Sequence, residues 1–115
     1  MKFKKWSVFR ANLEPVIGSK QGKTRPVLII SEDITNDNLS IVNVLPITSY
    51  KVGRTIYPNE VFLDKSISAL PNDSIILCYQ IRTIDKKRLS NFYSKIEDVK
   101  IQEEINDALR FQLGL

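Results

Sequence analysis

The chain contains no histidine and a single cysteine among its 115 residues, and these two shortages remove whole classes of chemistry. Without histidine there is no Ser-His-Asp triad, no histidine-assisted ribonuclease catalysis and no ordinary zinc site. One cysteine cannot form an internal disulfide. Because Cys78 lies in an apolar run, we expect a buried structural thiol there rather than a nucleophile. No stretch approaches the roughly 20 apolar residues that span a bilayer.

What the chain does contain fits one folded domain over residues 1–115. Hydrophobic residues make up 43% of the chain and charged residues 26%, which is typical of a globular domain that buries a core. The basic start, residues 1–5, is not followed by the hydrophobic segment of a signal peptide. We therefore expect a cytoplasmic protein with no membrane partner.

The net charge of +4 is unevenly distributed along the chain. Residues 1–25 carry +6 and residues 76–95 carry +4, whereas residues 26–50 and 96–115 each carry −3. If the two basic segments share one face, that face suits a polyanion. The alternative is charge spread over all faces for solubility, and the charges alone favour neither.

The hydrophobic pattern predicts a series of short strands followed by one helix. Strands are expected at residues 6–13, 26–31, 40–48, 56–63 and 74–81. The strand at 26–31 is apolar throughout, as expected of a strand covered on both faces, and Pro46 suggests a bulge or an edge position. Strands at this spacing favour a small, curled antiparallel sheet or barrel, with the residues near 33–38 forming a turn.

The period changes to that of a helix near residue 98. One helical face carries Ile101, Ile105, Ala108, Leu109, Gln112 and Leu113. Asp98 is suited to cap the start of this helix and Gly114 to end it. We expect the helix to lie against the sheet, and its acidic residues argue against a role in polyanion binding.

The loop at residues 18–26 is the most unusual segment. Its donor-rich side chains precede a rigid strand, which suits contact with phosphate, although an ordinary polar loop remains the simpler alternative. Gly18 and Gly22 lack the spacing of a P-loop. Arg25, at the start of the apolar strand, would be partly buried and held in place, as an ion-pair partner or as an oxyanion stabiliser. Thr48 and Ser49 end the third strand and offer hydroxyl donors.

The carboxylates show no convincing metal site. Glu32, Asp33 and Asp37 cluster in a turn that we expect to be solvated, without further ligands. Asp85 lies close to Arg82 along the chain, and a local ion pair is its simplest explanation.

Four blocks of the chain together resemble the MazF/PemK family of bacterial toxins. They are residues 13–30 (LEPVIGSKQGKTRPVLII), 45–49 (LPITS), 73–89 (DSIILCYQIRTIDKKRL) and 108–115 (ALRFQLGL). The blocks occur in order over nearly the whole chain. Four blocks together are far more specific than any one of them.

The resemblance implies a mainly β fold with α, a small SH3-like antiparallel barrel with a C-terminal helix, the fold of CcdB and MazF toxins. It implies a homodimeric endoribonuclease of a type II toxin–antitoxin system that cleaves single-stranded mRNA without a metal or other cofactor. It also implies a cognate antitoxin protein, through which alone the toxin would reach operator DNA.

The same resemblance assigns roles to individual residues. It places the family's catalytic arginine on Arg25 and its catalytic threonine on Thr48. Substrate-binding positions fall on Ser19, Lys20, Gln21, Ser49, Gln80 and Arg82.

The chain departs from the family pattern at two places. Lys20 replaces an acidic residue, so the cleavage sequence does not transfer from the family, because a cation stands where a base-edge acceptor is usual. Trp6 and Ser7 replace the usual glycine and acidic residue. Neither departure affects Arg25 or Thr48.

Two other functions are compatible with the same fold. A non-enzymatic gyrase poison resembling CcdB would rely on a C-terminal Trp-Gly-Ile, but this chain ends in Leu-Gly-Leu and its single tryptophan is Trp6. A catalytically silent RNA-binding or regulatory paralogue is the other alternative. The presence of Arg25 and Thr48 favours the nuclease.

Overall fold

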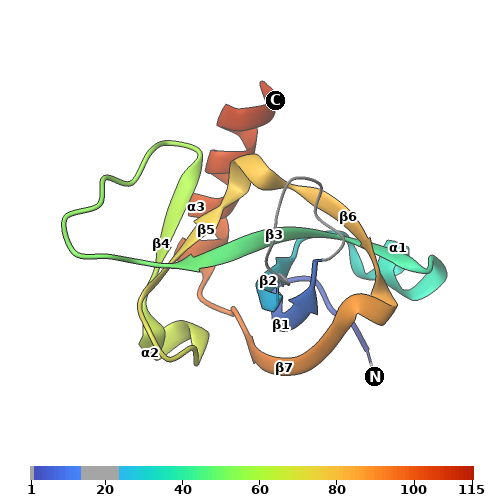
Figure 1. Cartoon of the computed structure of the whole chain (residues 1–115). Helices are drawn as coiled ribbons and strands as arrows, with labels where there is room; N and C mark the ends of the chain where they lie inside the picture. The colour runs from blue at the N-terminus through green and yellow to red at the C-terminus, as the bar shows by residue number, and fades with distance from the viewer. Residues whose placement is uncertain (1, 14–23) are drawn as a thin grey trace.

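The computed structural model describes residues 2–13 and 24–115 (Figure 1). In chain order the elements are β1 (Ser7–Asn12), β2 (Thr24–Ile29), α1 (Asp33–Asn38), β3 (Ile41–Ser49), β4 (Glu60–Leu63), α2 (Lys65–Ser68), β5 (Ser74–Leu77), the 3-10 turn η1 (Cys78–Gln80), β6 (Arg82–Asp85), the 3-10 turn η2 (Lys86–Arg88), β7 (Leu89–Lys95) and α3 (Val99–Leu113). No helix in this part of the chain is long and apolar enough to cross a membrane.

The strands form one antiparallel sheet in the order β4-β5-β3-β2-β1-β7, with β6 also paired to β3. The long strand β3 is the centre of this arrangement. Its first half pairs with β6 and its last residues pair with β5, while β2 lies along its other edge. The sheet curls strongly (Figure 1), and no pairing between the described strands closes it into a complete barrel.

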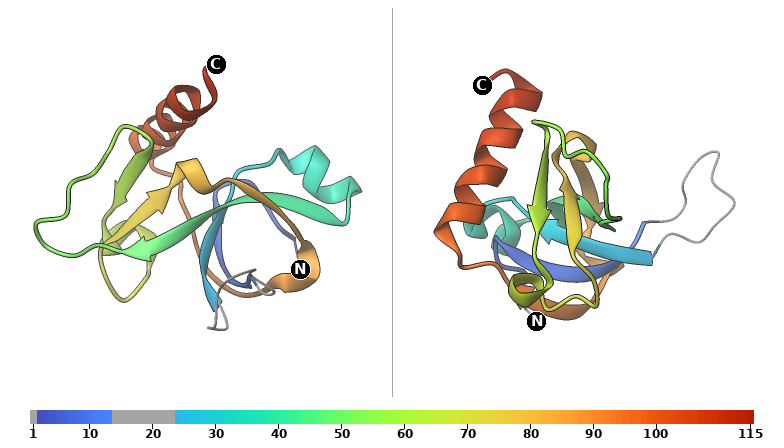
Figure 2. Two further views of the ribbon diagram at one scale, coloured as in Figure 1. Left: turned by 45° about the horizontal axis from the view of Figure 1, so that its top comes forward. Right: turned by 90° about the vertical axis from the view of Figure 1, so that its left-hand side faces the viewer.

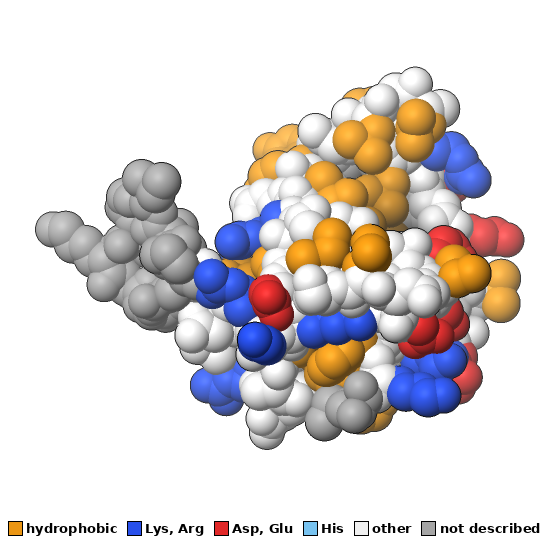
Figure 3. All heavy atoms as spheres, turned by 90° about the vertical axis from the view of Figure 1, so that its right-hand side faces the viewer, with side chains coloured by type: hydrophobic (Ala, Val, Ile, Leu, Met, Phe, Trp, Pro, Cys, Tyr) orange, Lys and Arg blue, Asp and Glu red, His pale blue; other side chains and the backbone are white. Residues whose placement is uncertain are grey.

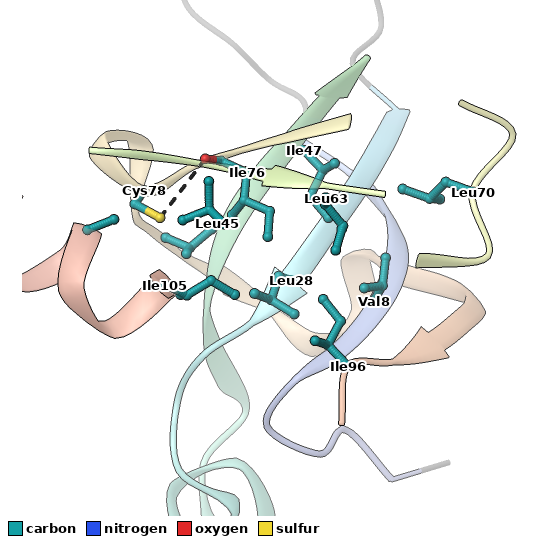
Figure 4. Close-up of a cluster of buried hydrophobic side chains, with 12 residues drawn as sticks. Val8, Leu28, Leu45, Ile47, Leu63, Leu70, Ile76, Cys78, Ile96 and Ile105 are labelled. Carbon is teal, nitrogen blue, oxygen red and sulfur yellow. Dashed lines mark hydrogen bonds between the residues drawn. The ribbon is translucent and has the colours of Figure 1, made fainter. Parts of the chain in front are cut away.

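Two hydrophobic cores lie on opposite sides of the central strands because successive side chains of a strand alternate between its faces. The helix-side core (Figure 4) consists of Val8, Leu28, Leu45, Ile47, Val61, Leu63, Leu70, Ile76, Cys78, Ile96, Ile105 and Ala108. The curl-side core consists of Phe9, Ala11, Leu13, Val27, Ile29, Val42, Val44, Ile84 and Leu89. In β2, Val27 and Ile29 enter one core and Leu28 the other, so the prediction of a strand covered on both faces is confirmed.

The helix α3 is confirmed together with both of its predicted caps. The Asp98 side chain accepts a hydrogen bond from the Ile101 amide, and Gly114 adopts a φ of 71°, in the left-handed region that ends helices. The helix lies against β4 and η1 (Figure 2), where Ile105 and Ala108 are buried. The predicted apolar face does not continue to the end of the helix, because Leu113 is about half exposed and Gln112 is exposed and hydrogen-bonds Asn59.

Pro46 was expected at a bulge or an edge, and the edge placement is wrong because β3 is a central strand. Pro46 pairs with Val27 of β2. On the other side of β3, the pairing with β6 ends at Val44 and the pairing with β5 begins at Ile47. Pro46 therefore lies where β3 changes partner, a gap in which no ladder pair is formed on that side.

The strand predicted at 74–81 ends at Leu77, where the chain enters the 3-10 turn η1. Two further segments differ from their predicted secondary structure because side chains replace backbone pairing. The predicted turn near 33–38 is the helix α1, whose buried Asn36 donates to the carbonyls of Phe3 and Ser31. The strand predicted at 56–63 is shortened to β4, because Glu60 accepts hydrogen bonds from Arg54 and from the Tyr57 amide and so folds the preceding residues into a loop.

Trp6, one of the two departures from the family pattern, has a φ of 74°. The left-handed region is open to glycine at little cost, whereas a bulky side chain is strained there. Two backbone hydrogen bonds hold Trp6 in this conformation, one from its amide to the Ile29 carbonyl and one from the Ile96 amide to its own carbonyl. The indole also packs against the helix-side core. A glycine, which the resemblance implies is usual at this position, would adopt this backbone conformation without strain.

Candidate active site

Arg25 and Thr48 lie at the same end of two adjacent strands. Arg25 is the second residue of β2, and Thr48 is the last but one of β3. The antiparallel register pairs Val27 with Pro46, and each of the two candidate residues stands two positions beyond that pair. Because side chains alternate, Arg25 shares the face of Val27 and Thr48 the face of Val44, which is the face of the curl-side core.

Neither side chain has a partner in the part of the chain that the structure describes. Both residues are half-buried, and neither the Arg25 guanidinium nor the Thr48 hydroxyl makes a hydrogen bond or ion pair with any residue that the structure describes. A half-buried arginine without a carboxylate is a fixed fork of donors open to an anionic ligand. Between the two alternatives left by the sequence, an ion-pair partner and an anion stabiliser, the geometry favours the second.

Arg82 lies on the other side of β3 from Arg25. It pairs with Val44, so its side chain projects from the same sheet face as Thr48, four residues or about 13 Å away along β3. The ion pair expected between Arg82 and Asp85 does not form: the Asp85 carboxylate instead accepts from the Lys87 amide and caps η2. Arg82 therefore has no carboxylate partner among the described residues.

Ser49 and Gln80 occupy different positions from the two catalytic candidates. Ser49, the last residue of β3, is exposed and pairs with Ser74, so it projects from the helix-side face, opposite to Thr48. Gln80 is exposed at the end of η1, between β5 and β6. Three further candidates, Ser19, Lys20 and Gln21, lie outside the described residues.

The two basic segments of the chain are neighbours in space. β1, from the first segment, pairs with β7, from the second, and Arg88 donates a hydrogen bond to the carbonyl of Asn12. Figure 3 shows a face of the molecule on which Lys and Arg side chains are widely spread, with some Asp and Glu among them. The adjacency fits a binding face for a polyanion that is mixed rather than purely basic.

A pocket of about 230 Å³ adjoins this strand end. It is lined by Pro26, Ile47, Thr48, Ser49, Leu70, Pro71, Asn72, Ser74 and Tyr93. The place of Pro71 and Asn72 beside Thr48 has no local sequence signal, because it requires the pairing of Ser49 with Ser74 across β3 and β5. The contribution of Tyr93 from β7 has no sequence signal at all.

The carboxylates near residue 33 are engaged by the N-terminal segment. The Lys5 ammonium forms an ion pair with Glu32 at 2.6 Å, and the Lys5 amide donates to the Asp33 carboxylate at 2.7 Å. These contacts give both carboxylates a structural role.

Cys78 is buried as predicted, and burial raises the pKa of its thiol to about 12, so it stays protonated at neutral pH and is a poor nucleophile.

A second hollow surface lies on the opposite side of β4 from the sheet centre, between the loop at 51–59 and α3. Its two adjoining pockets, of about 430 and 480 Å³, share Pro58, Glu60 and Phe111. The bidentate pair between Arg54 and the buried Glu60, at 3.0 and 2.8 Å, forms part of its wall. Phe111 is 64% exposed, so this surface offers an apolar side chain to solvent beside the exposed carboxylates Glu104 and Asp107.

Comparisons with known proteins point to one family. A family model described as PemK-like, MazF-like toxin of type II toxin-antitoxin system matches residues 4–113. The chain is 42% identical to the endoribonuclease MazF of Staphylococcus saprophyticus over 108 residues, which are 94% of this chain and 88% of the relative. A mycobacterial endoribonuclease solved in complex with its cognate antitoxin has a TM-score of 0.79 at 25% identity, covering 98% of this chain and 96% of the other. MazF of Deinococcus radiodurans, with a TM-score of 0.80 at 23% identity over 100% and 99% of the two chains, shares the fold.

Proposed function

On the premise that the chain belongs to the family of PemK-like, MazF-like toxins of type II toxin–antitoxin systems, we propose that Arg25 and Thr48 are the catalytic pair of an RNA-cleaving toxin. The chain is a toxin endoribonuclease of a toxin–antitoxin system. The observation that carries the assignment of the pair is their position at one end of β2 and β3, with no partner among the described residues.

The substrate supplies the nucleophile that this chain lacks. In single-stranded RNA the ribose 2′ oxygen attacks the adjacent phosphorus and loses its proton, the bond from phosphorus to the 5′ oxygen breaks, and that oxygen gains a proton as it leaves. The enzyme must align the attack and stabilise the charge that develops on the phosphorane. No histidine, metal or covalent side-chain intermediate is required by this route.

Arg25 and Thr48 supply different parts of that stabilisation. The Arg25 fork donates hydrogen bonds to the phosphorane oxygens and delivers the proton to the leaving 5′ oxygen. The Thr48 hydroxyl donates to a non-bridging oxygen. Ser19, Lys20, Gln21, Ser49, Gln80 and Arg82 contact the flanking nucleotides, whose unstacked bases are read by stacking and by hydrogen bonds to their edges.

The partners follow from the same premise. A solved mycobacterial relative is in complex with its cognate antitoxin, and Deinococcus radiodurans MazF is solved together with MazE. For this chain we propose a cytoplasmic homodimer opposed by a cognate antitoxin whose acidic, disordered segment folds onto the basic face of β1 and β7. Operator DNA would be reached only through that antitoxin.

The chemistry of the product ends tests this route. Cleavage through the 2′ oxygen leaves a 2′,3′-cyclic phosphate on one product and a 5′-hydroxyl on the other. Treating the products with polynucleotide kinase should therefore label their 5′ ends without prior phosphatase treatment. A 5′-phosphate on the products would exclude the mechanism, and the absence of any cut in diverse unstructured RNAs by folded protein would exclude the function.

A further inference from the structure

The pocket beside Thr48 has the form of a binding site for one planar, partly apolar group. Its floor is made by Ile47, Leu70 and Ser74, each at most 6% exposed, and the ring of Tyr93 packs against the helix-side core from β7. Its volume of about 230 Å³ is just below the range of about 300–1,000 Å³ found for sites that hold drug-sized ligands. One nucleobase suits such a space, whereas a longer stretch of RNA does not.

The wall that carries Pro71 and Asn72 is fixed from several directions. The Leu70 amide donates to the Ser68 hydroxyl at 3.0 Å, and the Ser74 hydroxyl donates to the Asn72 carbonyl at 2.9 Å. At the end of the turn, Asp73 accepts from the Tyr50 amide at 2.8 Å through its carbonyl and from the Lys65 amide at 2.9 Å through its carboxylate. A wall braced in this way is organised before any ligand arrives, which reduces the entropic cost of binding.

The rim of the pocket, in contrast, offers polar groups that no described residue engages. The Asn72 side-chain amide and the Ser49 hydroxyl are exposed, Tyr93 is half-buried, and none of the three side chains makes a hydrogen bond to any described residue. An asparagine amide presents donors and an acceptor side by side, the pattern needed to hydrogen-bond a base edge in a bidentate manner. An apolar floor with an aromatic ring and an uncommitted amide at its rim is how proteins read an unstacked RNA base.

The position of the pocket relative to Thr48 decides which base it would take. Thr48 contributes to the lining, and Ser49 projects into the helix-side face while Thr48 follows the face of Arg25. The pocket thus adjoins the catalytic candidates at Thr48, which lines it, while its floor lies on the helix-side face of β3. A base that enters it must belong to a nucleotide adjoining the cleaved bond.

We propose that this pocket holds one unstacked base of the substrate RNA beside the cut and that Asn72 determines which base is preferred there. The inference rests on the proposed function and deepens it. It assigns the base preference of cleavage to the turn that precedes β5 and to β7. Asn72 does not touch the reacting atoms, so its effect is on the choice of site.

Sequencing of the cleavage sites in a long, diverse RNA tests the assignment. Wild type should show a base preference at each position of its motif. Asn72→Ala should lower the preference at one position next to the cut by a factor of about 5 to 150, the value of one bidentate base contact, and leave the other positions as they were. Asn72→Asp, which replaces the amide donors by acceptors, should favour a different base at that same position.

The matched control is Asn38→Ala, which truncates an exposed asparagine on α1, at the opposite end of the molecule from α2 and this pocket (Figure 1). Its cleavage profile should equal that of wild type. If wild type cuts selectively and both Asn72 variants, folded by circular dichroism, keep its profile, the inference is wrong while the proposed function stands. If wild type makes no cuts, the function itself is wrong and the inference falls with it.

Discussion

At the scale of single residues, the proposed chemistry depends on two side chains that have no partner among the described residues. Arg25 follows a loop and begins an apolar strand, and Thr48 stands near the end of β3. Both identities follow from the resemblance, and their proximity follows from the strand register that pairs Val27 with Pro46. Sequence patterns alone place each residue on its strand but not beside the other.

Thr48→Val should lower kcat for RNA cleavage by about 10² to 10³, because it removes one hydrogen-bond donor to the transition state while keeping the shape and strand propensity of the side chain. Thr48→Ser retains the hydroxyl and should cleave within a few-fold of wild type. Single-turnover kinetics on a short RNA that contains one site measure both. Equal rates for Thr48→Val and wild type would remove Thr48 from the catalytic pair.

At the scale of the elements, most of the strands and the C-terminal helix could be predicted from the sequence. The apolar run of β2 and the caps of α3 are local signals, and both are confirmed. β6 and β7 were missed because their short segments alternate weakly and owe their form to pairing with β3 and β1. α1 and the loop conformation of residues 56–59 were missed because single side chains, Asn36 and Glu60, determine the backbone there.

The Arg54–Glu60 pair predicts a pH dependence of stability. Hydrogen bonds from the Arg54 guanidinium lower the pKa of the Glu60 carboxyl below its ordinary value. A lowered pKa stabilises the folded protein fully above the unfolded value of about 4.3, and this stabilisation is lost as the pH falls through the folded value. Glu60→Gln should therefore melt at a lower temperature than wild type at pH 7, and the difference should shrink below about pH 4.

Thermal unfolding of both proteins from pH 7 to pH 3 provides the comparison. Glu97→Gln is the control, because Glu97 is exposed and makes no ion pair among the described residues. It should track wild type at every pH. A Tm difference for Glu60→Gln that is absent at pH 7, or that grows as the pH falls, would contradict the role given to the pair.

At the scale of the whole molecule, the candidate site could be named from the sequence only in part. The sequence proposed Arg25, Thr48 and Arg82 as site residues, and the strand register explains why Arg25 and Thr48 lie at the same strand end. The sequence did not indicate the pocket wall formed by Asn72 and Tyr93, because this wall brings together β3, β5 and β7, which are distant in sequence. Long-range strand pairing is the information that a local pattern lacks.

The proposed homodimer predicts that an exposed apolar surface is covered in solution. Phe111 lies at the end of α3 beside two adjoining pockets, and in Figure 3 hydrophobic side chains are visible at the top of the view, the height at which α3 ends. Phe111→Lys should place a charge on that surface and shift the protein from dimer to monomer in sedimentation experiments.

The control is Ile34→Lys, an equally exposed apolar residue on α1, which should remain dimeric. A wild-type protein that sediments as a monomer at tens of micromolar would contradict the proposed homodimer. If Phe111→Lys stays as dimeric as the control, α3 is not part of the interface.

The most direct test of the central claim is cleavage of a long, unstructured RNA in the presence of EDTA by wild type, Arg25→Ala and Arg110→Ala. Arg110 is an exposed arginine of α3 that pairs only with Asp107 among the described residues. Arg110→Ala therefore removes the same charge as Arg25→Ala, but at a position away from the candidate site. Discrete cuts that share a short motif should persist in EDTA for wild type and Arg110→Ala and fall by at least about 10² for Arg25→Ala. Cleavage by Arg25→Ala at the wild-type rate, or loss of all cuts in EDTA, would contradict the account.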